Sequence, residues 1–414
     1  MGMRVTTGMM MNTYRFNLQN STSTLSDARN KVLTQRKFDS YAEDPASATM
    51  AWRIRQAMYN NNDYQVNNSD TYSRFNIAWT TMGVVNNDLS DKDGRFSAIR
   101  ATDDSTASGR QPLGQVLKNG ADTIIQAMNS AKYGDHFVFA GNDEMNVPFS
   151  WSDDGKLLYR GIDVATKEVK MPTRTTTTPD WVPKAGDYSM PRKVPEKHVV
   201  DPATPGYDKD DPDALLTAEQ KEENQWIDYY NSDWAKLQAL AHEEQNVDLG
   251  MGLQEDANGN LINGSAFNRS LPGINMLGGY GLDDDGDPKN VVLLMKKLGD
   301  LCSNCDPESG AWDPDPGTAS TIQEEANRLL DKIIKARGRT TEALDEIDTK
   351  AHFLKENQSR LETQGDYLQE ERVNIEQVDL ADAITEFSWD YYCYSSALKV
   401  GTQLLSQSLL DYMS

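Results

Sequence analysis

Two segments of this sequence gather side chains that could bind a metal ion. Asp283, Asp285 and Asp287 follow one another closely, and the segment 256–260 reads Asp-Ala-Asn-Gly-Asn. Carboxylate and amide oxygens are the ligands that Ca²⁺ prefers, but neither segment has the glycine position or the closing glutamate of an EF-hand loop. Asp-Gly sequences are typical of turns. We therefore expect turns at both places, with a calcium site as the alternative.

A third segment has part of a zinc-protease motif. His242 opens the sequence His-Glu-Glu-Gln-Asn, but Asn246 stands where the second histidine ligand is required. The remaining histidines fall in separate predicted elements; they are His136, His198 and His352. The four histidines therefore do not predict a metalloprotease.

Cys302 and Cys305 form an isolated Cys-x-x-Cys pair, without the second pair of a structural zinc site. We expect two incidental loop thiols, with a local disulfide or a redox pair as the alternative. The sequence has no Gly-x-Ser-x-Gly motif, phosphate-binding loop or dinucleotide fingerprint. We expect no catalytic residue, no cofactor and no metal. Four tryptophans of the middle region are more often core residues than a ligand-facing patch; they are Trp151, Trp226, Trp234 and Trp312.

The net charge excludes two classes of partner. The 414 residues carry a formal charge of −23, and residues 148–316 alone hold 31 acidic against 16 basic side chains. Such a surface repels nucleic-acid phosphates and anionic lipids, so we expect no nucleic acid and no membrane surface as partners. No apolar run approaches the roughly 18 residues that a membrane helix needs. The N-terminus also lacks the pattern of a Sec-type signal peptide.

Proline divides the chain into three parts. Fourteen of the 16 prolines lie between Pro148 and Pro316, and none lies in the last 98 residues. Because proline breaks helix interiors, both ends are expected to form long helices. The fold class is therefore mainly α with a β-rich middle. The chain is expected to fold back so that its two ends form a coiled-coil-like helical core, which carries an outer α+β domain.

Heptad patterns run through both ends of the chain. Apolar residues at alternating steps of three and four need a partner helix to cover them. The N-terminal seam consists of Met11, Tyr14, Leu18, Leu25, Ala28 and Val32, with Ser21 in register. The C-terminal seam consists of Ile384, Phe387, Tyr391, Tyr394, Leu398, Leu405 and Tyr412, with Gly401 and Ser408 in register. We expect both seams to form an assembly interface, with an ordinary intramolecular bundle as the alternative.

Charge predicts which helices pair. Residues 1–38 have a balance of +5 and residues 373–414 a balance of −5. Opposite charges beside two seams favour pairing of the first helix with the last. Such a two-helix pair buries few side chains, so we expect it to be loose in the monomer and to become ordered against neighbouring copies.

Local signals place the remaining elements. Asp44 and Pro45 predict an N-cap and the first position of a helix that runs to about residue 100. A second helix should run from Pro112 to about Lys132, and another from Val291 to Leu301. Asp153-Asp154-Gly155 between two apolar triplets predicts a β-hairpin. A helical insert is expected at about 214–244, after an exposed loop at 172–212.

Four segments resemble the flagellin family, and most closely its members at the hook–filament junction. They are residues 3–10 (MRVTTGMM), 35–48 (QRKFDSYAEDPASA), 133–142 (YGDHFVFAGN) and the end from residue 378 (VDLADAITEF) through 397–401 (ALKVG) to 408–413 (SLLDYM). The resemblance covers about 150 residues from the front and 95 from the back. The acidic, Trp-bearing insert near 214–244 departs from the family pattern.

The resemblance implies a folded-back chain with three domains. These are an inner terminal helix pair (1–44 with 373–414), a helical bundle (45–147 with 317–372) and an outer variable domain (148–316). It implies a structural and non-enzymatic subunit that forms a homo-oligomeric ring at the hook–filament junction, outside the cell. The implied partners are hook-associated protein 1, flagellin and a cytoplasmic flagellar export chaperone, with export unfolded through the flagellar type III apparatus. The alternatives are a filament-forming flagellin, or an outer binding or catalytic module on a flagellin-like stalk.

Overall fold

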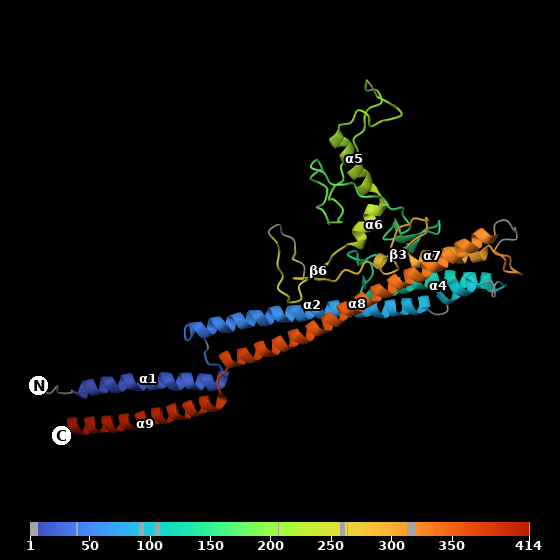
Figure 1. Cartoon of the computed structure of the whole chain (residues 1–414). Helices are drawn as coiled ribbons and strands as arrows, with labels where there is room; N and C mark the ends of the chain where they lie inside the picture. Colours follow the sequence, from blue (N-terminus) through green and yellow to red (C-terminus); the bar gives the residue numbers. More distant parts are fainter. Residues whose placement is uncertain are drawn as a thin grey trace. The chain divides into compact units, whose positions relative to one another are not determined.

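The computed structural model describes residues 7–38, 40–90, 95–103, 108–205, 207–256, 261–262, 264–312 and 319–413. Their contacts divide the chain into two compact units. The first unit comprises Met1–Val66 and Ser359–Ser414, and the second comprises Asn67–Gln358. Figure 1 labels the elements of both. The described residues are mainly α-helical with a minor β part, which confirms the predicted fold class.

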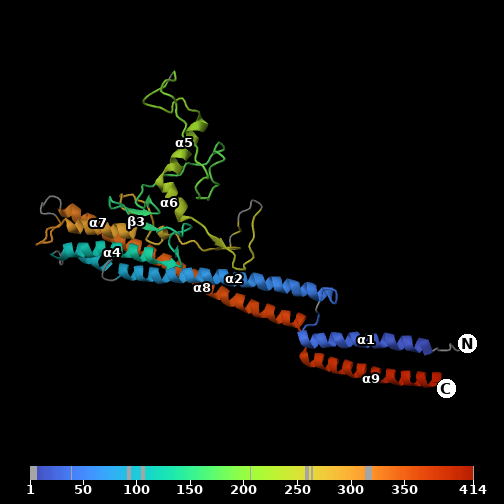
Figure 2. The same cartoon turned by 180° about the vertical axis from the view of Figure 1, so that it is seen from behind.

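The first unit pairs the two ends of the chain. Helix α1 (Thr7–Thr34) lies beside helix α9 (Leu380–Met413) in both Figure 1 and Figure 2. Tyr14 contacts Gly401 while Lys31 reaches Glu386, so the two helices run antiparallel. The pairing that the opposite charges predicted is therefore present.

Helix α2 (Pro45–Ser90) begins where the sequence predicted. The carboxylate of Asp44 accepts hydrogen bonds from the backbone N–H groups of Ala46 (3.1 Å) and Ser47 (3.0 Å). These bonds satisfy two of the donors that a helix start leaves unpaired. The Ser47 side chain and the two backbone N–H groups together lower the pKa of Asp44. The helix ends at Ser90 rather than near residue 100, and a separate helix α3 (Arg95–Thr102) follows.

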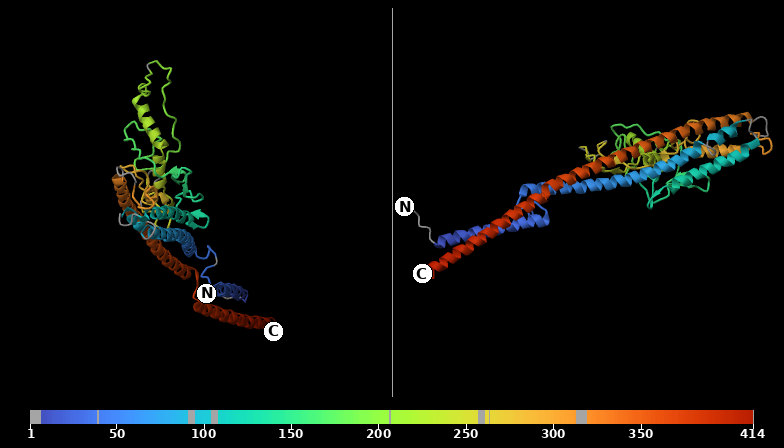
Figure 3. Two further views of the ribbon diagram at one scale, coloured as in Figure 1. Left: turned by 90° about the vertical axis from the view of Figure 1, so that its right-hand side faces the viewer. Right: turned by 90° about the horizontal axis from the view of Figure 1, so that it is seen from below.

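Helix α8 (Ala319–Glu376) packs along α2 through residues spaced seven apart. In the first unit the Asn61 amide donates to the carbonyl of Leu361 (3.0 Å). In the second unit the Asn68 amide donates to the carbonyl of Leu354 (2.9 Å), and Figure 3 shows both helices from two further sides. The buried residues at this spacing on α8 are Ala326, Ile333, Thr340, Ile347, Leu354, Leu361 and Leu368. This strict heptad is the pattern of a coiled-coil seam.

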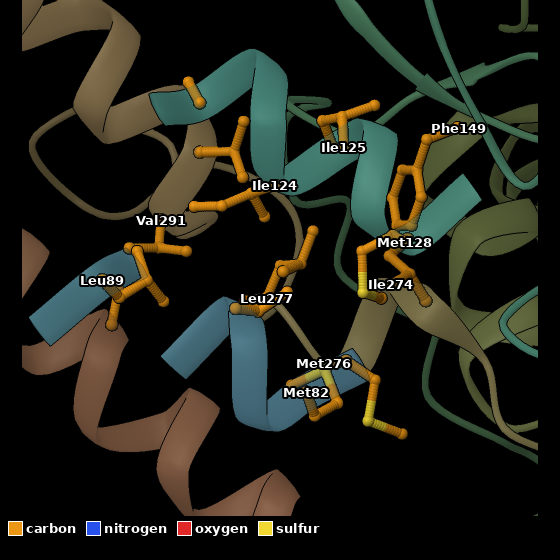
Figure 4. Close-up of a cluster of buried hydrophobic side chains, with 14 of the residues drawn as sticks. Met82, Leu89, Ile124, Ile125, Met128, Phe149, Ile274, Met276, Leu277 and Val291 are labelled. Atoms are coloured by element: carbon orange, nitrogen blue, oxygen red, sulfur yellow. The ribbon is translucent and has the colours of Figure 1, made fainter. Parts of the chain in front are cut away.

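The core of the second unit lies where α4 (Arg110–Ser130) meets α7 (Val291–Ser303). Ile124, Met128 and Val291 belong to one cluster of buried apolar side chains, shown with its neighbours in Figure 4. The helices approach closely at Gly114, where an added Cβ would lie 2.5 Å from the Cβ of Cys302. Both helices match the predicted segments to within two residues at each end.

The strands are short and antiparallel. β3 (Phe149–Trp151), β4 (Leu157–Tyr159) and β5 (Ile162–Asp163) form a three-stranded sheet in which Phe149 pairs with Tyr159. Gly155 has a φ of 75° in the first turn, so the predicted hairpin is confirmed. The other pairs are β1 (Lys132–Tyr133) with β2 (His136–Phe137), and β6 (Asn246–Val247) with β7 (Phe267–Asn268). A short 3₁₀ helix, η2, spans Gly273–Asn275.

The predicted helical insert consists of two helices, α5 (Ala218–Asn231) and α6 (Asp233–Ala241). Ser232 separates them and caps α6 through a hydrogen bond from the N–H of Ala235. Trp226 and Trp234 fill a small core of the insert, together with Tyr229 and Tyr230. Trp151 and Trp312 pack against the main cluster instead. The four tryptophans are therefore core residues, as their spacing predicted.

The segment 172–212 has no regular element among its described residues, but α5 holds it in place. The Asn224 side chain accepts from the N–H of His198 (2.8 Å) and donates to its carbonyl (2.9 Å). The neighbouring Glu223 carboxylate bonds the His198 imidazole (2.7 Å) and the Trp181 indole (3.0 Å). Most of its described residues are exposed, as the sequence predicted, and α5 fastens part of the segment.

Candidate assembly surface on the terminal helices

The predicted N-terminal seam lies on one face of α1. Ala28 is only 2 % exposed. The other members are half-buried, whereas most of the residues between them are exposed; these members are Met11, Tyr14, Leu18, Leu25 and Val32. Their shared burial results from the packing of α1 on α9.

Two polar contacts fix the register of this pair. The Tyr14 hydroxyl donates a hydrogen bond to the carbonyl of Ala397 (3.1 Å). At the other end of the pair, the ammonium of Lys31 lies 3.3 Å from the carboxylate of Glu386. Both partners of that ion pair are exposed enough for solvent to screen it, so it contributes little stability. Tyr14 is therefore the more specific contact.

The predicted C-terminal seam is only partly covered in the structure. Phe387 and Tyr394 are half-buried, but Ile384, Tyr391 and Leu398 are 47 %, 60 % and 40 % exposed. The side chains of Leu405 and Tyr412 lie outside the described residues. The covered face of α9 also contains Ala383 and Ala397, which the predicted seam did not include, and Gly401, which stands in register with that seam.

Helix α9 consequently has apolar surface on both sides of its contact with α1. At 100° per residue, one exposed stripe consists of Leu380, Ile384, Tyr391 and Leu398. Trp389 (66 % exposed) and Val400 (51 %) lie on the opposite side. A helix that covers only one of its three apolar faces is typical of a protein that packs against further helices.

Helix α2 also has an exposed apolar stripe, on the part that belongs to the first unit. Trp52, Tyr59 and Val66 are spaced seven apart and are 65 %, 70 % and 53 % exposed. Seventeen of the 33 exposed large apolar side chains of the described residues belong to the first unit, which is less than a third of the chain. Exposed apolar surface is therefore concentrated in the first unit, which contains both predicted seams.

The connections between these helices are fastened to each other. Arg36 and Gln377 form an isolated antiparallel bridge, and the N–H of Lys37 donates to the carbonyl of Glu376 (2.8 Å). The Glu376 carboxylate lies 2.7 Å from Nε of Arg55, and this pairing raises the pKa of the guanidinium. Backbone contacts of Arg36 and Lys37 with Glu376 and Gln377 thus hold the turn after α1 against the turn before α9.

The aspartates 283, 285 and 287 form the only group of three possible metal ligands found among the described residues. Cations of this chain already occupy it. Asp287 is fully buried, and its carboxylate accepts from Lys297 (2.6 Å), Lys332 (2.6 Å) and Arg328 (3.0 Å). Burial raises the pKa of Asp287, but the bonds from Lys297 and Lys332 outweigh it and lower the pKa to about 2. The geometry is that of an internal ion-pair cluster.

The four histidines and their acidic neighbours do not lie together at one site among the described residues. His242 stacks on Tyr188 at a ring distance of 4.2 Å, and Glu243 pairs with Arg160 (2.7 Å). The remaining histidines pair with different glutamates; His136 lies near Glu144, His198 near Glu223 and His352 near Glu356. The candidate loop 256–260 lies largely outside the described residues.

The cysteine pair is buried and reduced. Cys302 and Cys305 are both free, and the Cys305 thiol donates to the carbonyl of Cys302 (2.9 Å). Burial raises the pKa of the Cys302 thiol to about 12. A thiol in that state is neutral at neutral pH and therefore a poor nucleophile.

None of the described helices is long and apolar enough to cross a membrane. No protein-family model and no curated protein matches this sequence. Among solved structures, the chain is similar to one described as a "putative flagellar hook-associated protein" from Vibrio parahaemolyticus. The two are 12 % identical, the match covers 81 % of this chain and 100 % of the other, and the TM-score is 0.46. A likeness at this level does not by itself assign a family or a function.

Proposed function

We propose that this chain is a structural subunit of the bacterial flagellum, flagellar hook-associated protein 3, which joins the hook to the filament. In this role it forms a ring of identical copies outside the cell, with hook-associated protein 1 on one side and flagellin on the other. The proposal supposes no enzymatic activity, cofactor or metal, and no binding of nucleic acid or membrane.

The proposal rests on the apolar side chains of α9 that its contact with α1 leaves exposed. Its contact with α1 covers only one of its faces, while two further apolar stripes stay exposed on its flanks. Burying one such side chain contributes roughly 1.5–3 kcal/mol, so these stripes favour contact with other copies or other flagellar subunits. The four segments that resemble the flagellin family include the start of α1 and much of α9.

The same surface explains why a chaperone is part of the proposal. Exposed aromatic and aliphatic side chains on α9 would promote premature association in the cytoplasm. A flagellar export chaperone that covers α9 would prevent it until the chain is exported unfolded through the type III apparatus. Deleting residues 380–414 should then abolish chaperone binding, whereas an intact complex after that deletion would contradict this part.

A filament-forming flagellin is the second candidate, since it shares the terminal helices. A deletion strain separates the two. If the chain is the junction subunit, the strain keeps its hooks, loses its filaments and releases flagellin monomers into the medium. If purified filaments consist mainly of this chain, the flagellin alternative is correct.

A further inference from the structure

The first unit has a groove where the α1–α2 connection meets the end of α8. It consists of two hollows of about 620 Å³ and 440 Å³, which share Arg36, Arg55 and Glu376 in their walls. The first hollow adds Tyr59 and Arg372, and the second adds Trp52 and two more aromatic residues; these are Phe38 and Tyr41. All of these residues belong to the first unit.

The composition of the groove is that of a protein-binding hot spot. Its described lining residues include three arginines and four aromatic residues but only one carboxylate, that of Glu376, which pairs with Arg55. Among the described residues, neither Arg36 nor Arg372 has a carboxylate partner. Tyrosine, tryptophan and arginine dominate the energetics of known interfaces. The groove therefore fits an acidic partner that also carries an apolar or aromatic side chain.

One edge of helix α9 presents both an acidic and an aromatic side chain. Asp382 and Trp389 lie on the same side of the helix, away from the α1 contact, and both are exposed. Seven residues separate them, which is about 10.5 Å along a helix. Tyr59 and Arg372 line the same hollow of the groove. This edge of α9 therefore offers one aromatic and one acidic side chain to a hollow that has an aromatic and a basic one.

We infer that the groove binds the acidic edge of α9 from a second copy of this chain, with Trp389 against Tyr59 and Asp382 beside Arg372. The charges agree with this occupant, since residues 373–414 carry −5 and the groove contains Arg36 and Arg372, for which the described residues provide no carboxylate partner. Electrostatic complementarity of this kind sets the register of an interface and speeds association. The inference rests on the proposed assembly role and specifies which surfaces of two copies meet.

A cysteine cross-link tests the contact in the full-length protein with Cys393→Ser as background. A Tyr59→Cys variant is mixed under mild oxidation with a differently tagged Trp389→Cys variant. The expected product is a disulfide-linked heterodimer. Val66→Cys is the matched control, because Val66 is 53 % exposed on the same stripe of α2 but does not line the groove. It should give at least about tenfold less cross-link, which corresponds to about 1.4 kcal/mol.

A charge exchange checks the ionic part. Arg372→Glu in the Tyr59→Cys chain should reduce the heterodimer about tenfold, and Asp382→Arg in its partner should restore it. Absence of the heterodimer at the highest soluble concentration would overturn the inference. Cross-linking of Trp389→Cys to Val66→Cys instead of Tyr59→Cys would also overturn it, while leaving the assembly role intact. Loss of that role would appear separately, as normal filaments in the deletion strain.

Discussion

Tyr14 and Gly401 lie in direct contact although 387 positions separate them in the sequence. The ring of Tyr14 occupies the space that a side chain at position 401 would need, and its hydroxyl donates to the carbonyl of Ala397 (3.1 Å). A glycine on α9 thus accommodates a tyrosine from α1. This contact specifies how the first and last helices of the chain pair.

Replacing this glycine should loosen the terminal pair. In Gly401→Ala the new Cβ would overlap the Tyr14 hydroxyl, so the ring must leave its site. The higher helix propensity of alanine, worth about 1 kcal/mol, offsets only part of this loss. We expect faster amide hydrogen exchange in α1 and α9. Gly83→Ala is the control, because nothing lies within 4 Å of its added Cβ, and it should stabilise its helix slightly. Equal behaviour of the two variants would contradict the contact.

The buried cluster around Asp287 gives a second prediction. Asp287→Asn leaves Lys297, Lys332 and Arg328 without their shared carboxylate. We expect a loss of about 2–3 kcal/mol in the free energy of unfolding, less than for fully buried pairs because Lys297 and Arg328 are partly exposed. Asp284→Asn changes an exposed carboxylate in the same turn and should cost less than about 0.5 kcal/mol. Urea unfolding of both variants measures the difference, and equal losses would exclude the cluster as a stabilising element.

The pKa of Asp287 predicts how this stability depends on pH. Its folded-state pKa is about 2, below the ordinary value of 3.8, so folding favours the ionised form. The contribution is therefore complete above about pH 4 and is lost as the pH falls toward 2. The difference in unfolding free energy between wild type and Asp287→Asn should shrink across that window. A difference that stays constant between pH 6 and pH 2.5 would contradict the assignment.

Two asparagines in the α2–α8 seams should respond differently to the same substitution. Asn68 donates to the carbonyl of Leu354 and accepts from the amide of Asn357 (2.9 Å), so Asn68→Leu leaves buried polar groups unpaired and should cost about 2 kcal/mol. Asn61→Leu should be nearly neutral, since Gln65 also donates to the carbonyl of Leu361 (3.1 Å) and the Asn61 side-chain oxygen has no partner. Thermal unfolding of both variants compares them. A larger loss for Asn61→Leu would contradict this account.

Features encoded by neighbouring residues were predictable from the sequence. Asp44 followed by Pro45 starts a helix because its carboxylate caps the two N–H groups that follow, and Gly155 closes a hairpin because it tolerates a positive φ. The pairing of α1 with α9 was also predictable, from the opposite charges of the two ends.

Features that depend on distant residues were not predictable. The heptad pattern placed Ile384, Tyr391, Leu398 and Gly401 on the covered face of α9. Of these four only Gly401 is covered, because Tyr14 of α1 packs against it. Asp287 looked like part of a surface turn, because its partners Arg328 and Lys332 lie more than 40 residues away on α8. The groove at Arg36 and Arg55 depends on how two connections pack, which periodicity does not encode.

The most direct test of the central claim is to locate the protein on intact cells. Thr176→Cys, in the Cys393→Ser background, places an exposed thiol on the second unit without disturbing the neighbouring threonines that bond Glu222. Cells labelled with maleimide-gold are then imaged by electron microscopy, and Cys393→Ser alone serves as the control because Cys302 and Cys305 are buried. If the chain is the junction subunit, the gold forms a single band where the hook meets the filament. Label along the whole filament, or none on the flagellum, would contradict that role.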